Sequence, residues 1–184
     1  MPGVLLVRKT PLAGRLTPSE RDRLTANGVL GAERLAAPAA AHAACLDAVR
    51  AALAGLDVRE VRVEDLRPTD AGDAELIVTV GGDGTVFTAN TLATTAPVLT
   101  VNSDPVTSVG HFTRATAWTV ATMVQAWRTG HHRLEPVPRL AVTAGGTTHL
   151  VLNDCLFSNT NPAAMTRYQL EVPEGREFQR SSGV

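Results

Sequence analysis

A glycine-rich pentapeptide near the middle of the chain, Gly-Gly-Asp-Gly-Thr at residues 81–85, places one carboxylate among three glycines. It directly follows the apolar run 76–80, Leu-Ile-Val-Thr-Val, which is typical of a strand buried on both faces of a parallel sheet. A strand that ends in such a turn and leads into a helix leaves backbone N–H groups at the positive end of the helix dipole. The pattern therefore predicts an anion-binding turn, suited above all to phosphate.

The glycines and the aspartate have separate predicted roles. A side chain in place of a glycine would block the close approach of a phosphate or ribose, and we expect some of these glycines to adopt positive φ. Asp83 could orient a metal ion or accept the proton of an attacking hydroxyl, and general-base action contributes about 10²–10⁴ in rate. Phosphoryl transfer otherwise requires mainly positioning and charge neutralisation. The alternative is a plain tight turn, because glycine and aspartate are common turn residues.

Other chemistries find little support in the sequence. Lys9 is the only lysine and follows no glycine, which excludes a Walker-type phosphate loop. Cys45 and Cys155 match no zinc or redox spacing, so we expect two reduced, buried thiols. His131 and His132 are adjacent, and their side chains would point apart in a strand, so no metal site is predicted.

Length and charge limit the number of domains and the classes of partner that fit the sequence. The chain has 184 residues, enough for one core and part of a second. Its formal net charge is -1, from 17 basic and 18 acidic side chains without a run of like charge, which argues against nucleic-acid and membrane partners. The N-terminal apolar run is too short for a signal peptide and no window approaches a membrane span. We therefore predict a cytoplasmic protein.

Hydrophobic periodicity predicts alternating strands and helices in the first part of the chain. Buried strands are expected at 4–7, 76–80 and 98–101, with a further strand at 58–63. Thr17-Pro18-Ser19-Glu20 is a capping box that starts a helix ending near Asn27-Gly28. Longer helices are expected at 36–56, after the glycine turn up to Pro97, and at 118–127. In the first of these, the apolar stripe comprises Ala41, Cys45, Val49 and Leu53.

The period changes to two beyond Gly130. Strands are expected at 140–143 and 149–157 around a Gly145-Gly146 turn, and again at 165–172 and from 178 onward. The predicted fold class is therefore α/β, with a Rossmann-like three-layer nucleotide domain at residues 1–130. The first strands of a β-rich, β-sandwich domain, expected to be incomplete, follow at residues 131–184.

Three segments together resemble the NAD kinases. The pentapeptide is similar to a signature shared by NAD kinases, diacylglycerol and sphingosine kinases and, more loosely, phosphofructokinases. Residues 98–105 (Val-Leu-Thr-Val-Asn-Ser-Asp-Pro) and 108–112 (Ser-Val-Gly-His-Phe) resemble NAD kinases, whereas lipid kinases carry Asn-Glu where Phe87-Thr88 stands here. Leu152-Asn153-Asp154 resembles the Leu-Asn-Glu of NAD kinases, most closely the mitochondrial type, which also has Ser-Ser-Gly, found here at 181–183.

This resemblance implies a set of roles. ATP (or polyphosphate), with Mg²⁺, would phosphorylate the adenosine 2′-hydroxyl of NAD, and Asp83 would contact or deprotonate that hydroxyl. Asn153 and Asp154 would hold the ribose and base, although Asp154 is one methylene shorter than the usual glutamate. Asn102 is a further candidate, with a structural loop cap as its alternative, and so is His111, with a solvated histidine as its alternative. The residues that would line the phosphates are Gly81, Gly82, Gly84 and Thr85.

Two alternatives stay open, and one expectation concerns the end of the chain. Another kinase of the same superfamily, acting on a lipid or sugar, and a catalytically silent nucleotide-binding fragment both fit the motifs. Family members continue after Ser-Ser-Gly into a strand and a Thr-Gly-Ser turn, so we expect the β-rich part to lack its completion and the chain alone to turn over poorly. Because relatives are dimers or tetramers, the resemblance also implies a homodimer or homotetramer.

Overall fold

The structure is a computed structural model that describes residues 3–29, 31–92, 95–161 and 163–182. The chain divides into two compact units, the first ending at Pro136 and the second beginning at Val137. Each unit is described by itself below.

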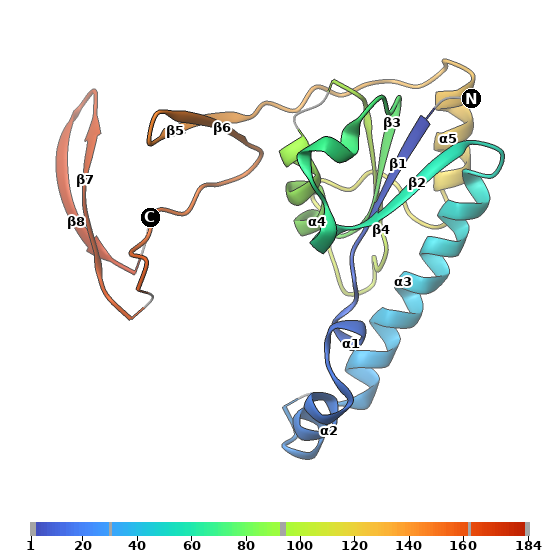
Figure 1. Cartoon of the computed structure of the whole chain (residues 1–184), viewed down its shortest axis with the longest axis horizontal. Helices are drawn as coiled ribbons and strands as arrows, with labels where there is room; N and C mark the ends of the chain where they lie inside the picture. The colour runs from blue at the N-terminus through green and yellow to red at the C-terminus, as the bar shows by residue number, and fades with distance from the viewer. Residues whose placement is uncertain (1–2, 30, 93–94, 162, 183–184) are drawn as a thin grey trace. The chain divides into compact units, whose positions relative to one another are not determined.

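The first unit is built on a four-stranded parallel sheet with strand order β2-β1-β3-β4 (Figure 1). β1 and β3 are central, and both are apolar runs that the sheet buries. This confirms the prediction of strands covered on both faces, which is the usual environment of a central parallel strand. The strands comprise β1 Gly3–Arg8, β2 Asp57–Arg62, β3 Leu76–Gly81 and β4 Val98–Asn102.

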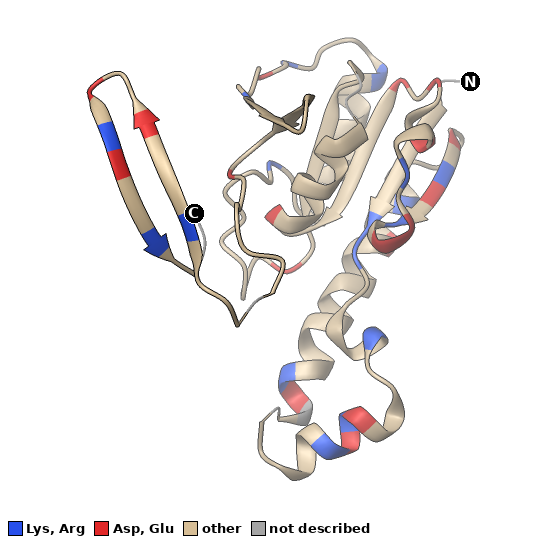
Figure 2. Ribbon diagram, turned by 60° about the vertical axis from the view of Figure 1, so that its left-hand side comes forward, with Lys and Arg blue, Asp and Glu red and all other residues tan. Residues whose placement is uncertain are grey.

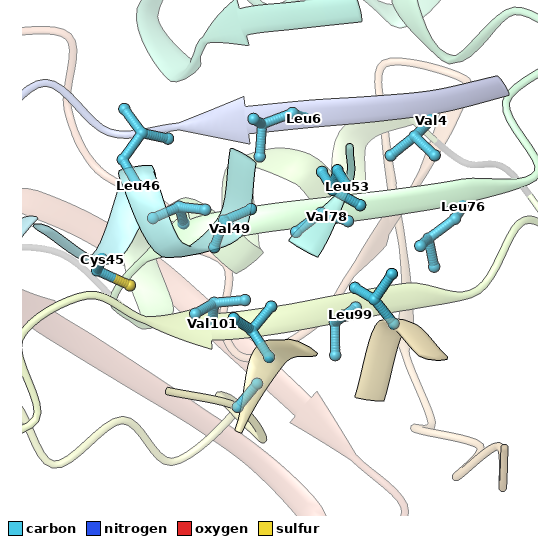
Figure 3. Packing of buried hydrophobic residues seen from close by; sticks show 14 residues of the cluster. Val4, Leu6, Cys45, Leu46, Val49, Leu53, Leu76, Val78, Leu99 and Val101 are labelled. Carbon is cyan, nitrogen blue, oxygen red and sulfur yellow. The ribbon is translucent and has the colours of Figure 1, made fainter. Parts of the chain in front are cut away.

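One face of the sheet carries the larger part of the core. Leu6 pairs in register with Val78, and Val78 with Leu99, so their side chains share this face. Helices α3 (Ala32–Ala52) and α5 (Val120–Arg128) cover it and contact each other. Figure 3 shows side chains of α3 packed over the strands of this cluster.

The predicted stripe is confirmed for its three larger residues, since Cys45 and Val49 on α3 and Leu53 at its C-cap are all buried. The helix begins at Ala32 rather than at the predicted Ala36, and it contains Pro38. α5 begins at Val120, two residues later than predicted, and ends before a Gly130 with φ +71°. A glycine in the left-handed region is the usual stop signal of a helix.

The opposite face of the sheet is covered by a short helix and three 3₁₀ turns. The helix contacts β1 and β3, and apolar side chains of the 3₁₀ turns enclose a smaller cluster that includes Leu5, Val7 and Ile77. Helices on both faces make three layers, which confirms the predicted Rossmann-like α/β fold. The covering elements are α4 Asp83–Ala89, η1 Val63–Asp65, η2 Pro68–Ala71 and η3 Asn90–Leu92.

The segment between β1 and α3 forms two short helices, α1 (Leu12–Arg15) and α2 (Pro18–Ala26). α2 begins with the predicted capping box, since the Glu20 N–H donates to Thr17 Oγ1 (3.3 Å) and the Thr17 N–H donates to Glu20 Oε2 (2.9 Å). Acidic and basic residues lie together on this helix (Figure 2), and none of its residues is buried. The capping box therefore stabilises it locally, without help from packing.

The second unit consists of two antiparallel hairpins. β5 (Leu140–Ala144) pairs with β6 (Thr147–Val151), and β7 (Thr166–Val172) pairs with β8 (Gly175–Ser181). Gly145 and Gly146 have φ values of +58° and +79°, as a two-residue type I′ turn requires, so the predicted hairpin is confirmed.

The predicted strand through residue 157 is wrong beyond Val151. β5 begins at Leu140, which pairs with Val151, so β6 has no further partner in this hairpin to extend against. Leu156 and Phe157 are correspondingly exposed. Cys155 lies in the same unpaired segment and is exposed, so the prediction of a buried thiol is wrong for Cys155 and confirmed for Cys45. Of the Ser-Ser-Gly segment, Gly183 lies outside the described residues. Among the described helices, none combines the length and apolarity needed to cross a bilayer.

Candidate functional site

The glycine motif forms the junction between β3 and α4. β3 ends at Gly81, Gly82 is the N-cap in an extended conformation (φ −105°, ψ −167°), and α4 begins at Asp83. None of the three motif glycines has a positive φ, so that part of the prediction is wrong. The physical reason is that an extended residue leads directly into a right-handed helix here, and both conformations are open to L-residues.

Close packing explains why two of the three motif positions are occupied by glycine. A Cβ at Gly81 would lie 2.9 Å from Thr85 Cβ and closer still to Thr85 Oγ1, so this position admits no side chain without a shift. A Cβ at Gly82 would approach Ser108 Oγ to 3.3 Å. Gly84 is different, because it is exposed and nothing lies within 4 Å of its missing Cβ. The protein's own packing therefore does not require a glycine at position 84.

Asp83 is held by two backbone groups from a distant loop. The His111 N–H donates to Asp83 Oδ2 (2.9 Å), and the Phe112 N–H donates to Asp83 Oδ1 (2.8 Å). Each carboxylate oxygen thus accepts one hydrogen bond, which fixes the orientation of the group. Charge-assisted bonds of this kind are about twice as strong as neutral ones.

Asn102 shapes the loop that supplies these donors. Its side chain is buried, its Nδ2 donates to the Ser108 carbonyl oxygen (2.9 Å), and its Oδ1 accepts from the Asp104 N–H (3.0 Å). Both ends of the amide are therefore engaged within the loop, in agreement with the loop-cap alternative. Gly110, with φ +67°, packs directly on this amide, since a Cβ there would lie 2.5 Å from Asn102 Nδ2.

Aromatic side chains close the loop over α4. The rings of Phe87 and Phe112 meet edge to face with centroids 5.3 Å apart, and His111 meets Phe112 in the same way at 4.9 Å. Thr100 Oγ1 donates to the Phe112 carbonyl oxygen (2.8 Å), which ties the loop back to β4. His111 itself is exposed, so its ring is free to meet solvent or a ligand.

The strand order places this turn at a topological switch point. The chain passes from β1 to β2 on one side and then returns to β3 on the other side of β1. In open α/β sheets, ligands bind outside the carboxyl ends of the strands at such a point. The motif at the end of β3 and the loop after β1 flank it.

The remaining predicted residues lie elsewhere. Thr85 is buried, with Oγ1 directed at Gly81. Asn153 and Asp154 belong to the second unit, where they follow β6 and are exposed. Within the first unit the structure brings together residues 81–85, Asn102 and His111.

Sequence reasoning missed several contributors to the site. Phe112 and Ser108 act partly through backbone groups, which carry no residue signature. Asp104 also belongs to the loop, where it is buried and accepts the Thr107 N–H (3.4 Å) and hydroxyl. The one available signal was Gly110, because an isolated glycine in a loop often marks a left-handed backbone position.

The fold and the site define a class of protein: a Rossmann-like α/β domain with a glycine-rich turn and a fixed carboxylate at its switch point. Residues 33–131 match the sequence profile of the ATP-NAD kinase N-terminal domain, and the chain belongs to this family. It is also 32% identical over 114 residues to a protein of Oryza sativa subsp. japonica named "Probable NADH kinase". The aligned region covers 52% of this chain and 35% of that relative, so the chain spans about a third of the relative's length.

Proposed function

We propose that the protein is an NAD kinase that transfers the terminal phosphoryl group of ATP, or of polyphosphate, to the adenosine 2′-hydroxyl of NAD. The hydroxyl oxygen bonds to the terminal phosphorus, the bond from that phosphorus to the bridging oxygen breaks, and ADP or a shortened polyphosphate leaves. The hydroxyl proton passes to the Asp83 carboxylate. The products are NADP and either ADP or the shortened polyphosphate.

The fixed orientation of Asp83 is the observation that carries this proposal. An ionised carboxylate offers about four lone-pair sites, and the two hydrogen bonds from residues 111 and 112 occupy two of them. The others are available to the hydroxyl proton of a bound acceptor. Because the group is already oriented, no reorganisation is needed when the acceptor arrives.

The other site residues have proposed positions around this base. Backbone groups near the exposed Gly84 would face the phosphates, and His111 would face the adenine. Asn153 and Asp154 would contact the ribose and base of the acceptor. Among the described residues, no group of three or more His, Cys, Asp or Glu side chains is arranged to hold a metal ion. In the proposal, Mg²⁺ enters as a complex with ATP, as the resemblance to NAD kinases implies. The assembly is proposed to be a homodimer or homotetramer, which light scattering on the purified protein tests.

A coupled NADP assay on the wild type and Asp83→Asn tests the mechanism. We expect the substitution to lower kcat by about 10²–10⁴, the usual contribution of a general base. Asp22→Asn is the matched control, because it removes one exposed carboxylate from α2. Equal rates for Asp83→Asn and wild type would remove Asp83 from the mechanism.

Asp83→Asn also changes the loop, and this effect must be measured separately. An asparagine at this position presents one N–H₂ group to a backbone N–H, so one of the two hydrogen bonds is lost. Denaturant unfolding and the KM for NAD report on that structural loss, whereas kcat at saturating substrates reports on the base. A higher KM for NAD with an unchanged kcat would show that Asp83 only positions the substrate.

The acceptor itself is tested with the same preparation. The relative named as an NADH kinase makes NADH a specific second candidate, so NAD and NADH are compared at equal concentration. Mass spectrometry of products from a pool that also holds lipid and sugar acceptors distinguishes another kinase of the superfamily. Calorimetry with NAD, NADP and ATP identifies a silent module, which would bind tightly without turnover.

A further inference from the structure

The loop after β1 lies directly beside the glycine turn. The Lys9 N–H donates to the carbonyl oxygen of Val80 (3.0 Å), the residue that precedes Gly81. The two loops therefore meet at the β1/β3 switch point, where a ligand bound to one lies within reach of the other.

Lys9 brings the chain's only lysine ammonium group to this point, and that group has no partner among the residues that the structure describes. The neighbouring cationic side chains already form ion pairs. Arg8 pairs with Glu60 (2.6 Å) and Arg62 pairs with Asp65 (2.6 Å). Lys9 is partly exposed, so its charge is available to an anion from outside.

The charge of Lys9 also influences two side chains of α3. Burial lowers the pKa of His42 to about 4, and the positive charges of Lys9 and Arg8 act in the same direction. Burial raises the pKa of the Cys45 thiol, and Lys9 opposes this rise. Cys45 in turn lies against the end of β4, with Sγ 3.8 Å from the Asn102 carbonyl oxygen.

One buried hydroxyl near this point lacks a hydrogen bond. Oγ of Ser103 has no hydrogen-bond partner among the described residues, whereas the His42 ring lies beside the backbone of Lys9, which raises its pKa slightly against the effect of burial. His42 and Ser103 are only 3% and 2% exposed, and the Ser103 N–H donates to the Gly81 carbonyl oxygen (3.1 Å). A serine hydroxyl can donate a proton, so an oxygen acceptor at this end of the sheet would satisfy a group that is otherwise unpaired.

We propose that Lys9 binds the phosphate chain of the phosphoryl donor at the β1/β3 switch point. The ligand class is a chain of linked phosphates, from a nucleoside triphosphate or from inorganic polyphosphate. The inference rests on the proposed function for the role of that ligand as donor. Lys9 neutralises charge on the donor, whereas the acceptor dinucleotide is not its partner.

Titration calorimetry on the whole protein tests the contact, with sodium tripolyphosphate, MgATP and NAD as separate probes. We expect Lys9→Met to weaken tripolyphosphate and MgATP binding about tenfold or more, because a hydrogen bond to a charged group is lost. NAD binding should change less than about twofold, and Lys9→Arg should restore most of the donor affinity. Arg128→Met, which removes a cation from the last turn of α5, is the charge-matched control.

Two results overturn the inference: unchanged donor affinity in Lys9→Met, or an equal loss for NAD. Failure of the wild type to bind either phosphate probe overturns it as well. If the wild type binds only one of the two probes, that probe identifies the donor. A protein that binds tripolyphosphate through Lys9 but makes no NADP refutes the proposed function and leaves this inference intact.

A second measurement needs no variant. Because Lys9 is the only lysine, an amine-reactive ester can modify just its ε-amino group and the N-terminus, and peptide mass spectrometry separates the two. Tripolyphosphate or MgATP should slow the modification of Lys9 several-fold and leave the N-terminus unaffected, while NAD should protect neither. Equal labelling rates with and without the phosphate probes overturn the inference.

Discussion

Gly110 is the position in the site where we expect the addition of one methyl group to destabilise the fold the most. Its φ of +67° lies in the left-handed region, which costs an L-residue about 1–2 kcal/mol. A Cβ would also lie 2.5 Å from Asn102 Nδ2 and closer to Thr113 Oγ1, and overpacking of this kind costs about 1–3 kcal/mol. Gly110→Ala should therefore destabilise the first unit by about 3 kcal/mol, or roughly 100-fold in its unfolding constant.

Gly130 provides the matched control. It has nearly the same φ, +71°, but nothing lies within 4 Å of the missing Cβ. Gly130→Ala should cost only about 1 kcal/mol, the conformational part alone. The difference between the two variants measures the contacts of the loop with Asn102 and Thr113.

Urea unfolding followed by far-UV circular dichroism is a suitable assay, since all the described helices lie in the first unit. Thr113→Ala in the Gly110→Ala background should recover part of the loss, because it removes the nearest obstructing atom. If Gly110→Ala costs no more than Gly130→Ala, the loop does not pack on Asn102 as described. The reasoning that links this loop to the orientation of Asp83 would then fail.

Three further predictions concern the rest of the first unit. Leu53→Ala should lower the free energy of unfolding by about 2–5 kcal/mol, because the side chain is 2% exposed, whereas Leu134→Ala, at 62% exposed, should change it by less than about 0.5 kcal/mol in the same denaturant assay. His42 has a pKa of about 4 in the folded protein, below its value in the unfolded chain, so stability is full above about pH 6.5 and falls as the pH drops toward 4. At pH 5 the loss should be about 2 kcal/mol, and urea unfolding of His42→Gln at pH 7.5 and 5 should show a smaller decrease than the wild type. Thr17→Ala should speed amide exchange in α2 about fivefold without changing the global unfolding midpoint, because α2 buries no residue; a shifted midpoint would show that the helix is coupled to the core.

Local sequence signals were sufficient for most of the elements. The buried runs of β1, β3 and β4 and the capping box at Thr17 depend on residues within a few positions of one another. The same holds for the Gly145-Gly146 turn, where two consecutive glycines set the hairpin register. In such segments the interactions that form the element lie between residues close in sequence, so the sequence pattern is sufficient to predict it.

The organisation of the site depends on long-range contacts that no local pattern contains. The donors to Asp83 come from 28 and 29 residues further along the chain, and they are backbone groups that any residue possesses. The conformation of residues 81–84 was mispredicted for a related reason, since the need for glycine at 81 arises from the side chain of Thr85 rather than from backbone dihedrals. The end of β6 likewise depends on where its partner strand begins.

The order β2-β1-β3-β4 also has a consequence for synthesis on the ribosome. β1 is made first, yet its two neighbours, β2 and β3, are completed only at residues 62 and 81. Its apolar side chains therefore lack any partner strand while some 50 residues are added, and lack the second partner for some 70, which takes several seconds at ordinary translation rates of about 5–20 residues per second. During that interval the nascent chain presents the run Val4 to Val7 to the surrounding solution, where a chaperone that recognises extended apolar segments would find its target.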